Sequence, residues 1–339
     1  MNIERYSRQM LFPPIKDAGQ RKIANSSVLV VGAGALGTVI SNHLVRAGIG
    51  KLRLVDRDYV ELSNLQRQML FDEDDVKEAL PKAIAAKRKL EKMNSDVVIE
   101  AAIDNVTNEN INALTDGIDI VLDGTDNFAT RYLLNDICYQ KNIPFSYGGV
   151  VSSRGMSALF IPGETPCLRC ITAEGSDSGQ TCDTIGVIAP AVDIVSSMQV
   201  VESLKYLTGN KTHLRNTMRT FDIWFNYQYD MKFPKADPDC PTCRRFVYPS
   251  LHRQAADHET VLCGRNTVQI HQKSHMDLKK WENRLKHVAA INRTPFLLKV
   301  QFDNELNFVI FPDGRVLIQG TEDRTKHAIG MIVILVHDV

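Results

Sequence analysis

The chain has 339 residues, and its 40 basic and 40 acidic side chains cancel to a formal net charge of zero. A balanced chain has no broad field to attract nucleic acid or an anionic membrane, so both are excluded as general partners and any phosphate binding must be local. The longest late apolar run, residues 329–336, is too short to cross a bilayer, and the first residues show no apolar signal segment. We therefore expect a cytoplasmic protein with one large domain and one small domain.

The first half of the chain alternates between strand and helix patterns. An apolar, β-branched run over residues 28–31 predicts a strand, a helix pattern follows to about Ala47, and the next strand pattern covers residues 51–56. Later patterns predict a helix over 81–93, strands over 97–99 and 118–122, and a helix over 127–140. Repeated strand–helix units with apolar strands indicate an α/β fold, with a Rossmann-like, mostly parallel sheet covered on both faces.

The second half predicts a helix and then a separate module. Apolar residues recur at helical spacing over 194–204, and Gly209 follows as a C-terminal cap. A stretch rich in Pro and Asp, residues 234–249, marks the edge of the first domain. Beyond it the patterns predict a strand at 267–271, a helix at 277–287, a hairpin around 311–315 and a final helix. We expect a domain over residues 1–250 and a small α+β module over 258–339 that carries no catalytic constellation.

A glycine-rich loop connects the first strand to the first helix. Gly32, Gly34 and Gly37 form the pattern Gly-x-Gly-x-x-Gly, and Asp56 ends the next strand. Such a loop lets the backbone approach phosphate oxygens at a helix N-terminus, and the carboxylate accepts hydrogen bonds from ribose hydroxyls. The pattern alone also fits a tight turn without a ligand. In this context it predicts a nucleotide or dinucleotide site.

Polar residues that follow the loop distinguish between ATP and a nicotinamide cofactor. Four hydrogen-bond donors follow within a short segment: Asn64, Arg67, Gln68 and Lys82. This number of donors is larger than hydride transfer requires, and it suits a triphosphate. Taken singly, such side chains are also typical of a solvated surface. As an ordered series after a glycine loop they favour ATP over the alternative of a nicotinamide-dependent oxidoreductase.

A second acidic group follows the predicted strand at 118–122. Asp126 and Asn127 lie just beyond its end, within the run Asp-Gly-Thr-Asp-Asn. Ligands of open α/β sheets bind at the carboxyl edge of the strands, and a carboxylate at that edge can hold Mg²⁺ beside phosphate. A carboxylate of this run, which includes Asp126, can therefore hold magnesium.

Two Cys-x-x-Cys pairs, Cys167/Cys170 and Cys240/Cys243, lie far apart in the chain. Four thiolates in two knuckles can close a tetrahedral zinc site without an open position, so the Zn²⁺ would be structural. A compact zinc ribbon separates its pairs by roughly 15 to 20 residues, so this site would join distant segments. The alternative is two redox or free thiol pairs. A reducing cytosol favours metal.

These motifs together resemble the MoeB/ThiF branch of the E1-like activating enzymes. The resemblance covers roughly residues 3 to 248, includes both cysteine pairs, and also rests on these runs: Arg5-Tyr6-Ser7-Arg8-Gln9, the glycine loop, Asp56-Arg57-Asp58, Ser63-Asn64-Leu65-Gln66-Arg67-Gln68, Pro81-Lys82-Ala83, Thr125-Asp126-Asn127 with Arg131, and Thr181-Cys182-Asp183-Thr184. The C-terminal module with Leu262-Cys263-Gly264-Arg265-Asn266 looks like an extension found on some bacterial members.

The resemblance implies adenylation, with ATP and Mg²⁺, of the C-terminal glycine carboxylate of a ubiquitin-like sulfur carrier. It assigns Asp56 to the ribose, Asn64, Arg67 and Lys82 to the phosphates, and Asp126 to magnesium. It also implies a homodimer in which Arg8 reaches ATP in the neighbouring subunit. Of the two carrier types, MoaD-like and ThiS-like, we favour a MoaD-like carrier and molybdenum-cofactor synthesis, although both present the same Gly-Gly tail.

Two further expectations follow from the resemblance. Cys182 corresponds to a cysteine that in some members forms a link to the carrier and in others is dispensable for activation, so both roles stay open. No rhodanese-like segment follows the adenylation domain, which implies that a separate protein donates sulfur. A non-catalytic scaffold of the same fold would be expected to lack Arg67 or Asp126, and both are present.

Overall fold

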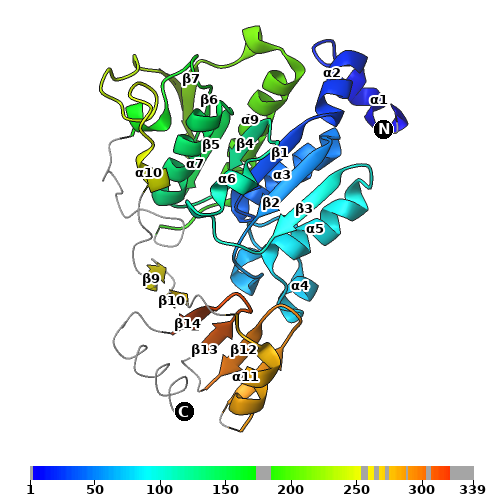
Figure 1. Ribbon diagram of the computed structural model, residues 1–339. Coiled ribbons are helices and arrows are strands. Elements are labelled where there is room, and N and C mark those ends of the chain that lie inside the picture. The colour runs from blue at the N-terminus through cyan, green and yellow to red at the C-terminus, as the bar shows by residue number, and fades with distance from the viewer. Residues whose placement is uncertain are drawn as a thin grey trace. The chain divides into compact units, whose positions relative to one another are not determined.

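The computed structural model describes residues 3–172, 185–252, 259–262, 267–271, 275–287, 289–302 and 307–320. Contacts within the chain define two compact units, residues 1–253 and 254–339 (Figure 1). The predicted division into two separately folding domains stays a prediction. Among the helices of the described ranges, none is both long and apolar enough to span a membrane.

The first unit is built on one eight-stranded sheet with the order β3-β2-β1-β4-β5-β6-β7-β8. Its strands are β1 (Ser27–Val31), β2 (Lys51–Val55), β3 (Val98–Ala102), β4 (Ile120–Asp123), β5 (Phe145–Val151), β6 (Arg154–Phe160), β7 (Thr217–Asp222) and β8 (Tyr227–Lys232). The strands from β3 to β5 pair in parallel, and β6, β7 and β8 extend the sheet in antiparallel fashion. The strand order changes direction at β1, between β2 and β4, which is where open α/β sheets bind their ligands.

Helices cover both faces of this sheet, as predicted. On one face α3 (Ala35–Ala47) packs against α5 (Lys82–Met93) and against α9 (Ala189–Thr208), and α9 also packs on β5 and β6. On the other face α7 (Phe128–Lys141) packs on β4 and β5 and contacts α6 (Ile111–Leu114). The shorter elements of the unit are α4 (Glu73–Lys77), α10 (Pro249–His252) and the 3₁₀ turns η1 (Leu62–Asn64), η2 (Leu168–Cys170) and η3 (Lys211–His213).

Two N-terminal helices, α1 (Ile3–Met10) and α2 (Lys16–Ala24), precede the sheet and were not predicted. The buried side chain of Tyr6 fixes α1, because its hydroxyl accepts a hydrogen bond from the Asn94 amide at 2.8 Å. The Gln9 amide donates to the Ala47 carbonyl at 3.0 Å. Since Ala47 ends α3, helix α1 is anchored at the C-terminal end of that helix.

Strand β3 begins one residue after the predicted start and runs three residues beyond the predicted end. The carboxylate of Glu100 lies inside this strand and accepts a hydrogen bond from the Arg53 guanidinium of β2 at 2.7 Å. A charged pair between neighbouring strands supports the sheet but interrupts an apolar run. The apolar pattern therefore located this strand and could not find its end.

The second unit contains a six-stranded antiparallel sheet with the order β11-β12-β13-β14-β10-β9. Its elements are β9 (Glu259–Leu262), β10 (Thr267–His271), α11 (Leu278–Leu285), β11 (Ala290–Arg293), β12 (Leu298–Gln301), β13 (Asn307–Ile310) and β14 (Arg315–Gln319). The structure confirms the predicted strand at 267–271, the helix and the hairpin, which joins β13 to β14. Leu278 and Leu285 of α11 pack into the core of this sheet. The predicted final helix lies outside the described residues.

Candidate active site and metal centre

The glycine loop contacts the end of β4 so closely that side chains are excluded. Gly32 has a φ of +91°, and its N–H donates to the Val55 carbonyl at 2.8 Å. A Cβ on Gly37 would lie 1.7 Å from the Gly32 carbonyl oxygen, and a Cβ on Gly124 would lie 2.6 Å from the same oxygen. The loop between β1 and α3 and the loop after β4 therefore lie side by side at the carboxyl edge of the sheet.

Asp56 joins the end of β2 to this glycine loop. One of its carboxylate oxygens accepts the Ala33 N–H at 2.6 Å, and the other accepts the Asp58 N–H at 2.7 Å. Burial raises the pKa of the Asp56 carboxyl above its ordinary value, and the nearby ammonium of Lys82 opposes that shift. The predicted ribose ligand thus lies beside the predicted phosphate loop.

Lys82 is buried at the first position of α5. Its ammonium lies 3.2 Å from a carboxylate oxygen of Asp58, and its N–H donates to the Asp58 carbonyl at 2.8 Å. A buried ammonium requires a partner of opposite charge. The sequence placed Lys82 in the site but did not identify Asp58 as its partner, because an Asp two residues after the ribose ligand carries no pattern of its own.

Asn64, Arg67 and Gln68 lie on or just after the turn η1. The turn is held beside Lys82 because the Val60 N–H donates to the Leu80 carbonyl at 2.8 Å. Asn64 uses its side-chain oxygen locally, to accept the Glu61 N–H at 3.0 Å, and the Arg67 guanidinium donates to the Ser63 carbonyl at 2.9 Å.

Gln68 is buried, and its Oε1 meets no donor within the described part of the chain. An unpaired buried acceptor carries a cost in stability that a ligand donor would remove.

A buried ion pair shapes the loop that carries Asp126. The Arg131 guanidinium donates to the Asp123 carboxylate at 2.9 Å and to the Thr125 carbonyl at 2.8 Å. Asp123 also accepts from the Thr125 N–H and hydroxyl, at 2.8 and 2.6 Å. The pair holds the strand end rigid, while Asp126 itself is exposed. The adjacent Asn127 caps α7 through its side chain, which accepts the Thr130 N–H at 2.8 Å.

Gln199 of α9 supports the same edge from the opposite face, and sequence reasoning missed it. This fully buried side chain donates to the carbonyls of Asp123 and Ser146 at 2.9 and 3.0 Å. It therefore ties the end of β4 and the start of β5 to the helix. The buried face of α9 also carries Ser196, Glu202 and Ser203, so no apolar stripe singles out Gln199 in the sequence.

Two predicted residues stand apart from this cluster. Arg8 is exposed on α1, which is anchored at the end of α3 remote from the glycine loop. Cys182 lies outside the described residues, as does Cys263 of the C-terminal module.

The four predicted zinc ligands converge from two distant segments. Their sulfur atoms all lie within 4.8 Å of one another, with Cys167 and Cys170 at 4.0 Å, Cys167 and Cys240 at 3.5 Å, and Cys170 and Cys243 at 3.5 Å. Zinc–sulfur bonds of about 2.3 Å in a tetrahedron place the sulfurs about 3.8 Å apart. None of the four forms a disulfide. The donor set and spacing are consistent with a closed zinc site.

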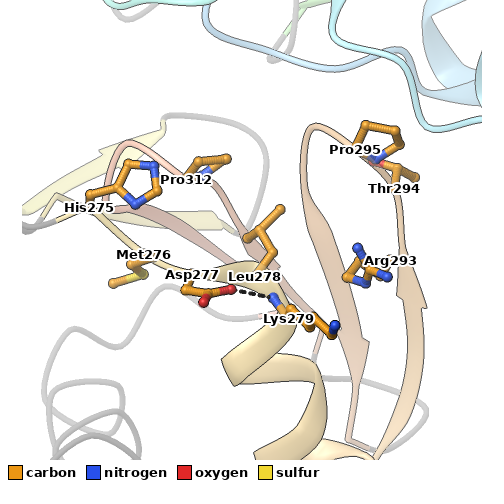
Figure 2. A pocket seen from close by; sticks show the side chains of 9 residues that line it. All are labelled: His275, Met276, Asp277, Leu278, Lys279, Arg293, Thr294, Pro295 and Pro312. Atoms are coloured by element: carbon orange, nitrogen blue, oxygen red, sulfur yellow. Dashed lines mark hydrogen bonds between the residues drawn. The ribbon is translucent and has the colours of Figure 1, made fainter.

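Figure 2 shows a hollow in the second unit, lined in part by His275, Lys279 and Arg293. Its floor includes the start of α11, where the Asp277 carboxylate already accepts the N–H groups of Lys279 and Lys280 at 2.9 and 3.2 Å. The helix N-terminus is thus capped by the chain itself. Among the described residues lining the hollow, no nucleophile with an adjacent base is found.

The fold and the polar cluster define a class: a nucleotide-binding α/β protein with its candidate site at the strand-order reversal and, on the same unit, a four-cysteine cluster consistent with a zinc site. The model of the ThiF family matches residues 6–242, and the chain belongs to that family of E1-like, ATP-binding adenylyltransferases. The family resemblance and the α/β fold expected from the sequence are confirmed.

Several known proteins are similar to the chain. It is 43% identical over 323 residues, which are 94% of this chain and 95% of the relative, to a sulfur carrier protein ThiS adenylyltransferase of Bacillus subtilis. It is 34% identical over 269 residues, 77% of this chain and 97% of the relative, to a sulfur carrier protein adenylyltransferase of Thermus thermophilus. A crystal structure of E. coli MccB with succinimide matches with a TM-score of 0.62 at 25% identity and covers 70% of this chain and 74% of that one.

We expect Gly37→Ala to destabilise the first unit by about 3 kcal/mol or more, because the new methyl group would collide with the rigid Gly32 backbone. Gly34→Ala is the matched control, since a Cβ there meets only the Gly124 oxygen at 3.9 Å. Urea unfolding of both variants measures the difference. Equal midpoints would show that the first turn of α3 does not pack against Gly32 as described.

Proposed function

We propose that the chain adenylates the C-terminal carboxylate of a small sulfur carrier protein with ATP, releasing pyrophosphate, and that this carrier is ThiS-like. The observation that carries the proposal is the similarity to the Bacillus subtilis ThiS adenylyltransferase, which extends over 94% of the chain and so includes the C-terminal module. The ThiS-like carrier thereby replaces the MoaD-like carrier that we favoured from the sequence. Membership of an adenylyltransferase family also replaces the nicotinamide-dependent alternative.

In this proposal, the polar cluster at the sheet edge binds ATP. The N–H groups of the glycine loop and the N-terminus of α3 face phosphate, and Asp56 accepts from the ribose. Lys82, Arg67 and Asn64 contact the phosphates. Lys82 is already buried beside Asp58, so the ammonium is in place before the nucleotide arrives. A preorganised charge stabilises the transition state without a further cost of reorganisation.

Asp126 would hold Mg²⁺, together with phosphate oxygens. Its exposed carboxylate follows a strand end that the Arg131–Asp123 pair makes rigid, which suits a hard divalent cation. When bound there, Mg²⁺ neutralises phosphate charge. The Asp126 carboxylate would fix the position of the ion.

The reaction needs no protein nucleophile. A carrier carboxylate attacks the α-phosphorus, an acyl–phosphate bond forms, and the bond to pyrophosphate breaks, so the enzyme has to align the groups and stabilise the departing charge. Adenylation would therefore not require Cys182. This residue would either form a covalent link to the carrier during later sulfur transfer or have no essential role. A separate protein would donate the sulfur.

ATP–pyrophosphate exchange with purified carriers tests the choice of substrate. We expect exchange with a ThiS-like carrier and much weaker exchange with a MoaD-like carrier, because the similarity that spans 94% of the chain is to a ThiS adenylyltransferase. A ThiS-like carrier that lacks its last glycine is the control and should give none. Exchange that favours the MoaD-like carrier would contradict the proposed client.

An uncovered part of the sheet supports a protein as the substrate. Strand β8 is exposed along its whole length, and it forms the edge of the sheet in the described chain. Tyr227, Tyr229 and Met231 alternate along it, and Met156 of β6 lies on the same face because both Met156 and Tyr229 pair with Thr220. The exposed fractions of Tyr227 and Tyr229 are 69% and 63%. Aromatic side chains exposed on a regular surface are typical of protein interfaces.

We expect the double change Tyr227→Ser and Tyr229→Ser to raise the KM for the carrier by about tenfold or more, because aromatic anchors dominate interface energy. The affinity for ATP alone should not change, since these residues lie outside the polar cluster. Val98→Ala, which removes an exposed side chain from β3 at the opposite edge, is the control. An unchanged carrier KM in the double variant would exclude this face from docking.

We also propose that Arg8 completes the site of a neighbouring subunit in a homodimer. Its helix is anchored at the C-terminal end of α3, whereas the glycine loop lies at the N-terminal end. The 13 residues of α3 rise by about 20 Å. Because of this separation, Arg8 lies far from the glycine loop of its own subunit. This placement is what an in-trans role requires.

Mixing two inactive variants tests this assignment. Arg8→Ala chains and Asp126→Ala chains should each lack exchange, whereas mixed dimers should regain one intact site that combines Arg8 of one chain with Asp126 of the other. Random one-to-one mixing should recover up to about a quarter of wild-type activity. Mixed dimers confirmed by native mass spectrometry but devoid of exchange would contradict the in-trans role.

A further inference from the structure

One buried carboxylate, on Asp136 of α7, contacts both cysteine knuckles. Its Oδ1 accepts from the Arg169 Nε at 3.0 Å, from the Thr242 hydroxyl at 2.7 Å and from the neighbouring Asn135 amide at 3.2 Å. Its Oδ2 accepts from the Arg169 Nη2 at 3.0 Å and from the Ser250 N–H at 2.9 Å. The exposed fraction of Asp136 is 0%. Five hydrogen bonds satisfy a charge that would otherwise be too costly to bury.

Three of these five hydrogen bonds come from residues inside the two knuckles. Arg169 lies between Cys167 and Cys170, and Thr242 lies between Cys240 and Cys243. Asp136 therefore holds the interior residue of each Cys-x-x-Cys turn. It joins the same two chain segments that the four sulfur atoms join.

Helix α7 makes further contacts with the first knuckle. The Asn135 side-chain oxygen accepts the Leu168 N–H at 2.9 Å, and the Arg169 guanidinium stacks over the Tyr132 ring at 4.5 Å. The Arg169 Nη2 also donates to the Ser250 hydroxyl at 2.7 Å. The guanidinium is thus fixed on α7 from several directions, and both knuckles take their positions from the helix.

We propose that Asp136 preorganises the zinc site by holding the two knuckles at the spacing that four thiolates need around one ion. This role is distinct from adenylation and depends on the cluster binding zinc. Without Asp136, the guanidinium of Arg169 and the hydroxyl of Thr242 lose their shared buried acceptor, and the cysteine pairs lose the link that this carboxylate makes between them. Asp136 is then a positioning residue, and its loss acts on metal affinity.

The test is zinc affinity in the full chain, measured by competition with a chromophoric chelator at fixed pH. Asp136→Asn keeps the shape but removes the charge, and residues that orient metal ligands change affinity by about 10- to 100-fold when altered. We expect a loss in that range. Asp119→Asn is the matched control, because the Asp119 carboxylate also accepts a backbone N–H, from Ser27 at 2.8 Å, away from the knuckles.

A second variant keeps the proposal testable if Asp136→Asn does not fold. Thr242→Val removes one of the five contacts and leaves the Arg169 pair, so it should weaken zinc binding by less than Asp136→Asn. Near-ultraviolet circular dichroism establishes that each variant is folded. Wild-type zinc affinity in folded Asp136→Asn, or in Thr242→Val when the first variant is unfolded, would overturn the proposal. A wild-type chain that binds no zinc would overturn it as well.

Discussion

The carbonyl oxygen of Gly32 lies where three segments of the chain meet. The start of α3 and the end of β4 both approach it so closely that neither Gly37 nor Gly124 tolerates a side chain. Because the backbones touch, the N-terminus of α3, the strand that leads to Asp126 and the strand end at Asp56 share one edge of the sheet. The polar cluster follows from this contact, since each of its side chains departs from a segment whose position the backbone has already fixed.

Helix α7 connects this edge with the metal centre. At its N-terminal end Arg131 forms a buried pair with Asp123 and holds the Thr125 carbonyl, and in its middle Asp136 holds Arg169 of the first knuckle. Each buried charge has a partner of opposite sign and additional hydrogen bonds, which is the condition under which ion pairs are tolerated in a core. Replacing Arg131 or Asp136 by an apolar residue would leave Asp123 or Arg169 buried without its opposite charge. The helix therefore places two sites in one rigid frame.

The alternation of apolar strands and helices was sufficient to predict the parallel part of the sheet and its two covered faces, because burial on both sides leaves a strong pattern. The exposed strand β8 leaves no such pattern, and the charged residue in β3 interrupts one. In the site, the motif residues were located but not their partners. Asp58 beside Lys82 and Gln199 beneath β4 are defined by tertiary contact, which no local spacing encodes. The proposed role of Arg8 requires a second chain, and the sequence of one chain shows no interface.

The proposed function divides recognition between two surfaces of the same sheet. Under the proposed function, the polar edge at β1, β2 and β4 binds ATP, which the ThiF family uses, and its residues carry motifs that identify the chemistry. The exposed face around β8 carries no motif, and Tyr227 and Tyr229 stand out only because they are aromatic and exposed. If the carrier docks there, specificity resides in side chains that can vary without altering adenylation. In that case the motif residues identify the reaction, and the choice between carriers depends on this second surface.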